Sequence, residues 1–122
     1  MIPRTIFDDY HEIFRASLKR FIAEEILPHY ADWEKAGIAP RSIWKRAGDQ
    51  GFLCTNVPEE YGGMGGDFLH SALMIEEMAR AGCTTPTFYL HSEIISPYLV
   101  HHGSDEQKRT WLPKMASGEV IT

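Results

Sequence analysis

V-P-E-E-Y-G-G-M-G-G-D, residues 57 to 67, is the stretch that decides the fold of this chain. Four glycines stand within the five residues 62–66, and such a run is too flexible to form a helix or a strand. Pro58 stiffens the entry to the stretch, and Asp67 offers an N-cap to the segment that follows. The stretch therefore predicts a shaped loop, and the segments on both sides of it have helical patterns.

A glycine-rich loop can also cradle a phosphate group, which is the alternative interpretation of this stretch. No Lys-Ser or Lys-Thr pair follows the glycines, and no strand pattern precedes them. Their spacing also fits neither a P-loop nor a dinucleotide fingerprint. We therefore favour a structural turn over a phosphate site.

The composition is that of one ordinary domain with its own core, because the chain has 122 residues and 43% of them are hydrophobic. The net charge is −5, with scattered basic residues, so we expect no nucleic-acid binding. Cys54 and Cys83 lack C-x-x-C partners, which indicates neither a zinc site nor a disulfide framework. We expect a cytoplasmic protein, with no secretion signal and no membrane span.

The segment before the loop predicts two helices. The first begins near Phe7 and changes direction or ends at Pro28, with a further turn before Gly37. The second begins at 39–42 and ends at Gly51. The predicted apolar stripe of the first helix is Phe7, Tyr10, Ile13, Phe14, Leu18, Phe21, Ile22 and Ile26, and that of the second is Ile43, Trp44 and Ala47. Phe52, Leu53 and Val57 then lead through the core as an extended segment.

The segment after the loop predicts three more helices. The third ends at Gly82, the fourth covers 84–102 with a bend at Pro97, and the fifth follows a capping box at 104–107, with its regularity limited by Pro113. Glu76, Glu77 and Arg80 are expected on the solvent side of the third helix. The apolar positions predicted for these three helices are Phe68, Leu69, Ala72, Leu73, Ile75, Met78, Ala79, Phe88, Ile94, Ile95, Tyr98, Leu99, Trp111, Leu112 and Met115. The predicted fold is therefore all-α, an up-and-down bundle of about five helices with the glycine loop between the second and third.

The histidines do not form a recognisable metal or nucleophile site in the sequence. His101 and His102 are adjacent on a helix, so their side chains point about 100° apart and do not converge on an ion. Ser92 follows His91 directly and lacks the flanking glycines of a nucleophile elbow. The carboxylate pairs at 59–60 and 76–77 are interpreted as solvated or capping residues. We expect no catalytic residue and no metal site in this chain.

The motifs, in their order and spacing, resemble the amino-terminal helical domain of the flavin-dependent acyl-CoA dehydrogenases. The resemblance covers essentially the whole chain and is closest to the long-chain branch of the family. It is carried by F-I-A-E-E-I-L-P (21–28), W-E-K-A-G (33–37), the 57–67 loop, E-E-M-A-R (76–80), H-S-E-I (91–94), G-S-D-E-Q-K (103–108), Trp111-Leu112-Pro113 and Ser117-Gly118-Glu119.

The resemblance implies α,β-dehydrogenation of a fatty acyl-CoA thioester in β-oxidation, with FAD as the hydride acceptor. Family members also contain a β domain and a carboxyl-terminal helical domain, which supplies the catalytic glutamate. The family's flavin-seating motif begins beyond a position like Thr122, so we expect this chain alone to be inactive and free of FAD. The implied partners are acyl-CoA, an electron-transfer flavoprotein, the remaining domains and further copies of the same subunit.

The resemblance further implies that the fourth helix lines one side of the acyl-chain cavity. Phe88, His91, Ser92 and Ile95 share one face of that helix and are the predicted substrate-binding residues. The alternative is that they pack inside the bundle, as apolar helical stripes usually do. For the whole chain, the alternative function is a free-standing helical interaction or self-association module without activity, because Val120 and Ile121 form an apolar tail.

Overall fold

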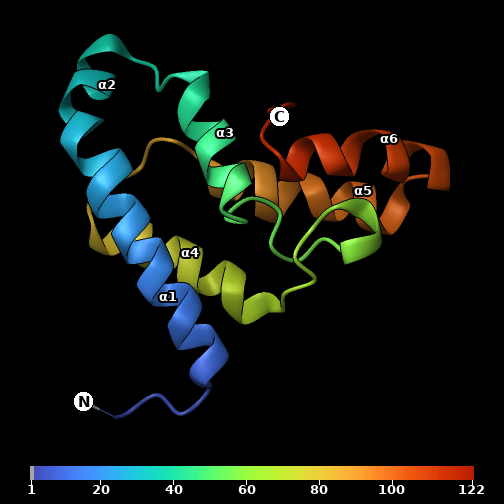
Figure 1. Ribbon diagram of the computed structural model, residues 1–122, viewed down its shortest axis with the longest axis horizontal. Helices are drawn as coiled ribbons and strands as arrows, with labels where there is room; N and C mark the ends of the chain where they lie inside the picture. The colour runs from blue at the N-terminus through green and yellow to red at the C-terminus, as the bar shows by residue number, and fades with distance from the viewer. Residues whose placement is uncertain (1) are drawn as a thin grey trace.

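The structure, a computed structural model, describes residues 2–122, and every regular element within that range is helical (Figure 1). The predicted all-α class is therefore confirmed. The α-helices are α1 (Asp9–Phe21), α2 (Tyr30–Ala36), α3 (Arg41–Asp49), α4 (Phe68–Arg80), α5 (Ser96–His102) and α6 (Asp105–Ala116). Two π-helices, η1 (Ile22–Ile26) and η4 (Leu90–Ile95), and two 3-10 turns, η2 (Leu27–His29) and η3 (Glu59–Tyr61), complete the set. Within residues 2–122, no helix has the length and apolar character needed to cross a membrane.

The helices form two neighbouring groups. α1 packs along α4, and α5 packs along α6, while α3 lies between the groups (Figure 1). The larger hydrophobic cluster joins α1, η1, α3 and α4, and the smaller one, which includes Tyr61 and Leu112, joins the glycine loop to α6. Because Gly48 of α3 lies against the backbone of Ser117, a side chain larger than hydrogen at 48 would separate α3 from the end of α6.

The first predicted helix is divided in the structure into α1, η1, η2 and α2. Asp8 caps α1 with a capping box to His11. At the far end the Leu27 amide donates to the carbonyl of Ile22, five residues earlier, so the helix widens just before Pro28. A proline has no N–H for the helical ladder, which explains why the regular α-helix stops here. Gly37, with φ 74°, ends α2 as expected.

The predicted apolar stripe of the first helix is wrong at its beginning. Tyr10 and Ile13 are 57% and 67% exposed, whereas His11 is buried. The inward face contains residues 11, 14, 18 and 21, at spacings of three and four, so His11 takes the place assigned to an apolar neighbour.

The loop at 57–67 is closed by its own backbone. Gly62 and Gly65 have φ values of 85° and 64°, which favour glycine. Gly63 lies so close to the carbonyl of Val57 that a Cβ would overlap it. The amides of all four glycines donate to carbonyls of the loop or of the segment just before it, namely Gly62 to Glu59 (3.0 Å), Gly63 to Pro58 (3.3 Å), Gly65 to Val57 (3.0 Å) and Gly66 to Thr55 (2.7 Å).

α4 begins at its predicted cap, but one of its residues that was expected to face solvent is buried. The Asp67 side chain accepts hydrogen bonds from the amides of Leu69 and His70. Glu77, expected on the solvent side, is buried, and its Oε1 accepts from Arg15 at 2.7 Å. α1 covers this side of α4, so the carboxylate faces a neighbouring helix and is paired there. Phe68 and Ile75 of the predicted apolar stripe are instead exposed.

The last two predicted helices differ from the expectation in detail. The fourth becomes helical at Phe88, four residues later than its predicted start, and consists of η4 followed by α5. Tyr98, expected to be a buried position, is 66% exposed. The Ser104–Gln107 capping box is present, and α6 continues beyond Pro113 to Ala116 without interruption.

Candidate functional site

The predicted substrate-facing residues lie on or beside η4, a π-helix. The Ser96 amide donates to the carbonyl of His91, five residues earlier, and the Ser96 hydroxyl donates to the carbonyl of Ser92 at 2.6 Å. Pro97 follows directly and has no N–H, so the Ser92 carbonyl has no backbone donor and accepts a hydrogen bond from the Ser96 hydroxyl instead. Such π-segments occur frequently at functional sites.

The structure separates the four predicted residues into three buried ones and one half-exposed one. Phe88, His91 and Ser92 are at most 1% exposed, whereas Ile95 is 40% exposed. Phe88 meets Trp44 of α3 edge to face, with ring centroids 4.9 Å apart. The three buried residues therefore anchor η4 to the interior, and Ile95 is the member that reaches the surface.

His91 joins η4 to the end of α6. Its Nδ1 accepts from the Thr122 amide at 3.2 Å, so Nε2 carries the proton and donates to the carbonyl of Met115 at 3.0 Å. Burial lowers the pKa of His91, and the hydrogen bond to Met115 opposes that change only in part. His91 is therefore a neutral, doubly hydrogen-bonded structural imidazole.

Ser92 lies beneath the segment that enters the glycine loop. Its hydroxyl oxygen accepts from the Cys54 amide at 2.9 Å. Burial raises the pKa of the Cys54 thiol to about 12, against the opposing hydrogen bonds of Ser96 and Ser92, so this cysteine is not a nucleophile. Burial also raises the pKa of Glu93, which a hydrogen bond from Ser71 opposes. These groups form a buried polar layer under η4.

Two apolar hollows lie at opposite ends of η4. The first has a volume of about 170 Å³, and Phe88 lines it together with Met74, Ile75, Met78, Cys83 and Pro86. The second has a volume of about 380 Å³, and Ile95 lines it together with Tyr98, Leu99, Trp111, Met115 and Val120. His91 and Ser92 line neither hollow. Apolar walls of this kind suit hydrocarbon, because each buried methylene contributes about 0.8 kcal/mol.

One cluster of ligating side chains was missed by the sequence analysis. His11, Asp67 and His70 bring one ligand atom each to within 4.8 Å of one another. A D-x-x-H pattern at both 8–11 and 67–70 was the available signal, but the sequence alone does not show that the two histidines meet. His101 and His102, in contrast, are exposed at the end of α5.

The glycine loop does not fit the diphosphate of a flavin nucleotide. A phosphate cradle needs free backbone amides, and all four glycine amides donate to carbonyls of the loop or of Thr55. The loop also carries Glu59, Glu60 and Asp67, whose charge repels a phosphate. These features favour the structural turn over a phosphate site, and no FAD contact is assigned to this loop.

These features define an all-α domain that presents apolar hollows along one interrupted helix. Residues 8–119 match the profile of the family described as "Acyl-CoA dehydrogenase, N-terminal domain", so the chain belongs to this family. It is 47% identical to the mitochondrial long-chain specific acyl-CoA dehydrogenase of Sus scrofa over 118 residues, which are 97% of this chain and 27% of the pig protein.

Solved structures show the same fold. An acyl-CoA dehydrogenase from Geobacillus kaustophilus matches with a TM-score of 0.93 and 43% identity, over 98% of this chain and 31% of that one. A Bacillus anthracis acyl-CoA dehydrogenase complexed with FAD matches with a TM-score of 0.83 and 34% identity, over 98% and 21% of the two chains. The chain thus spans less than a third of the length of these relatives.

Proposed function

We propose that residues 1–122 are the amino-terminal helical domain of an FAD-dependent acyl-CoA dehydrogenase, which removes hydrogen from the α and β carbons of a fatty acyl-CoA thioester. In this proposal the domain forms part of the wall of the acyl-chain pocket and part of the interface to the other domains. The main supporting observation is that Phe88 and Ile95 line apolar hollows at the two ends of η4.

In this proposal the residues of this chain bind the acyl chain and exclude water from it. Apolar side chains at both hollows exclude water and favour the methylenes of an acyl chain. His91 and Ser92 support the wall from behind, since their hydrogen bonds to Met115 and Cys54 fix η4 in position. FAD, when bound to the complete enzyme, accepts the hydride. The catalytic base and the flavin contacts belong to parts of the enzyme outside residues 1–122.

The remaining expectations are also part of the proposal. The partners are acyl-CoA, an electron-transfer flavoprotein and further copies of the subunit. A cytoplasmic location stays a prediction, and the pig relative, described as mitochondrial, gives it no support.

The first experiment tests the chain as it is. The isolated 122-residue chain should be colourless and inactive on acyl-CoA, because no flavin contact is assigned to it. Purification with stoichiometric FAD would contradict this assignment.

The second experiment tests the wall. This test uses the whole encoded protein, including any part beyond Thr122. In that protein, Ile95→Trp should fill the second hollow and raise KM for a long-chain acyl-CoA about tenfold. Ile13→Trp, at a 67% exposed position of α1, is the control and should leave KM within about twofold. Equal KM values in the two variants would show that Ile95 does not contribute to the wall of the acyl-chain pocket.

A self-associating helical module is the alternative function. Four large apolar side chains around η4, α5 and α6, Ile94, Ile95, Tyr98 and Trp111, are 40–66% exposed in this chain. Exposed apolar residues of this kind seek a partner surface. Sedimentation over a range of concentrations and an acyl-CoA dehydrogenase assay together distinguish the two functions. Self-association without dehydrogenase activity in the protein that includes any part encoded beyond Thr122 would favour the alternative.

A further inference from the structure

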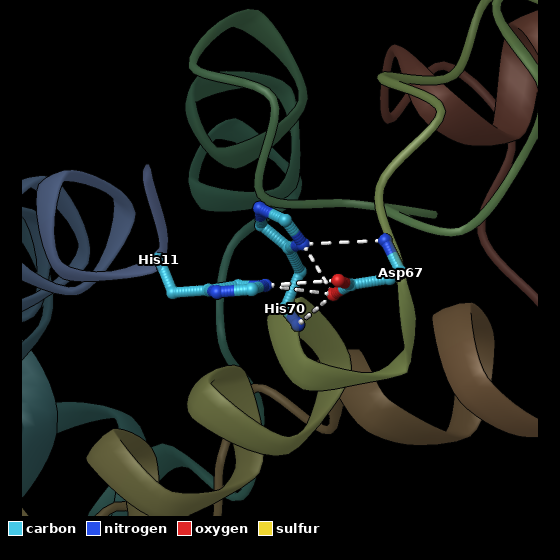
Figure 2. Close-up of side chains that lie close together, drawn as sticks. All are labelled: His11, Asp67 and His70. Atoms are coloured by element: carbon cyan, nitrogen blue, oxygen red, sulfur yellow. Dashed lines mark hydrogen bonds and ion pairs between the residues drawn. The ribbon is translucent and has the colours of Figure 1, made fainter. Parts of the chain in front are cut away.

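Two imidazoles and one carboxylate converge where the first turn of α1 meets the first turn of α4 (Figure 2). His11 Nε2 lies 3.0 and 2.9 Å from the two carboxylate oxygens of Asp67. His70 Nδ1 lies 2.9 Å from Oδ1 of the same carboxylate. The cluster combines residues 56 positions apart in sequence, so it is a product of the tertiary fold.

The two rings are held by the same device. Each histidine is the N3 residue of its helix, and its Nδ1 accepts from the amide of the N-cap residue, Asp8 for His11 and Asp67 for His70, at 3.2 Å. Both histidines are at most 4% exposed, and Phe14 packs edge to face against His70. Burial and aromatic packing therefore hold the rings in position before any ligand arrives, which lowers the entropic cost of binding. The hydrogen bond from the Asp67 amide to His70 Nδ1 breaks on binding, because that nitrogen has one lone pair.

The spacing of the ligand atoms is close to that of a metal coordination shell. Nitrogen and oxygen ligands lie about 2.1 Å from a zinc-class ion, which places neighbouring ligand atoms about 3.0 Å apart in an octahedron and about 3.4 Å apart in a tetrahedron. The His–Asp separations of 2.9 and 3.0 Å suit the octahedral value, as they also suit hydrogen bonds. All three ligand atoms lie within 4.8 Å of one another, so the two nitrogens need to approach each other only slightly to share an ion. Because His11 Nδ1 accepts from the Asp8 amide, His11 Nε2 carries the proton and donates it to the Asp67 carboxylate, and a cation takes the place of that proton.

A supporting carboxylate stands behind one ligand. Oδ1 of Asp8 lies 2.9 Å from His11 Nδ1, so when Nε2 binds a cation, Nδ1 can carry the proton and donate it to Asp8. Metal-bound histidines commonly have such a partner. His70 shows a different arrangement, because its Nε2 is buried without a hydrogen-bond partner among the described residues. Its Nδ1 is the ring nitrogen that faces the Asp67 carboxylate (Figure 2).

We propose that His11 Nε2, the Asp67 carboxylate and His70 Nδ1 bind one divalent transition-metal ion of the zinc class. Two nitrogen ligands favour such an ion over Mg²⁺ or Ca²⁺, which prefer oxygen. The Asp67 side chain is 56% exposed, so the remaining coordination positions are open to water. The bound ion joins α1 to α4 and stabilises their contact, and the site is independent of the acyl-chain wall.

The experiment is a titration of the chelator-treated chain with Zn²⁺, followed by calorimetry, with Mg²⁺ as the comparison. The expected result is one saturable zinc ion per chain, a raised Tm and no saturable Mg²⁺ binding. Asp67→Asn keeps an N-cap, and His70→Gln keeps a side chain that completes the capping box, so both variants should remain folded. Each should weaken zinc binding by at least about tenfold.

The control removes the exposed histidines of α5. The double variant His101→Ala, His102→Ala should bind zinc as the unchanged chain does. NMR gives a second readout that needs no variant, since zinc should shift the ring signals of His11 and His70 and leave those of His101 and His102 in place. Absence of saturable binding at millimolar zinc, unchanged affinity in D67N and H70Q, or loss of binding in the double variant would each overturn the proposal.

Discussion

His91 and Met115 are joined by a buried hydrogen bond of 3.0 Å, which ties the π-helix η4 to the end of α6. The bond fixes the tautomer of the imidazole, with the proton on Nε2, and leaves no exposed nitrogen for a new proton. η4 carries the proposed acyl-chain wall, so the position of that wall depends on this contact. The consequences for stability can be measured directly.

The first prediction concerns pH. Burial holds the pKa of His91 below its ordinary value of 6.5, so the unfolded chain binds a proton at higher pH than the folded chain does. The contribution of His91 to the free energy of unfolding is therefore complete above pH 6.5 and decreases as the pH falls from there to the lower folded pKa. Urea unfolding between pH 8 and pH 5 measures it. His91→Gln should show a shallower loss of stability, and an identical pH profile in the two proteins would be incompatible with this account.

The second prediction concerns Ser92. Its hydroxyl is the acceptor for the buried amide of Cys54, so Ser92→Ala leaves that amide without its partner and should cost about 1–3 kcal/mol of unfolding free energy. Ser42→Ala, at an exposed position of α3, should change it by less than about 0.5 kcal/mol. Equal effects in the two variants would show that the hydroxyl does not support the loop entry.

The third prediction concerns the glycine loop. Gly63→Ala would place a methyl group on the Val57 carbonyl, which must then move, so the variant should lose about 3 kcal/mol of stability. Gly82→Ala has open space around the new methyl group and is strained only by its φ of 72°, so it should lose about 1 kcal/mol. Chemical denaturation measures both. A larger loss at Gly82 would mean that φ, and not close packing, is the constraint.

The fourth prediction concerns the buried ion pair between α1 and α4. The side chains of Arg15 and Glu77 are 14% and 5% exposed. Glu77→Ala leaves the guanidinium with Glu12 as its remaining hydrogen-bonded partner and should cost about 2 kcal/mol. Lys45 and Asp49 pair on the surface of α3, and Asp49→Ala should cost less than about 0.5 kcal/mol. Thermal unfolding compares the variants, and similar Tm values would contradict the distinction between buried and exposed pairs.

The helical class and the main helix ends could be predicted from the sequence because they depend on local chemistry. Asp67 and Ser104 occupy their predicted caps, and Gly37 ends α2 in a left-handed conformation. These features involve residues within four positions of one another, so no knowledge of distant neighbours is needed. The family resemblance rested on the same motifs and is confirmed by the match over residues 8–119.

The inward face of each helix was harder to predict. A histidine took an inner position of α1, and Glu77 was buried because Arg15 of another helix neutralises it. The π-helices were not predicted, although each ends two residues before a proline, Pro28 or Pro97, that has no N–H for a helical hydrogen bond. Which side of a helix is covered depends on the path of the whole chain, and a hydrophobic pattern alone does not contain that path.

The sequence by itself determined that this chain is helical, where it turns, and to which family it belongs, because capping residues, glycines and motif spacing act over a few neighbouring positions. Only the tertiary structure decided that Phe88, His91 and Ser92 are interior, that Ile95 reaches a hollow, and that His11 meets Asp67 and His70. These contacts join residues tens of positions apart, and their geometry is set by how whole helices pack against one another.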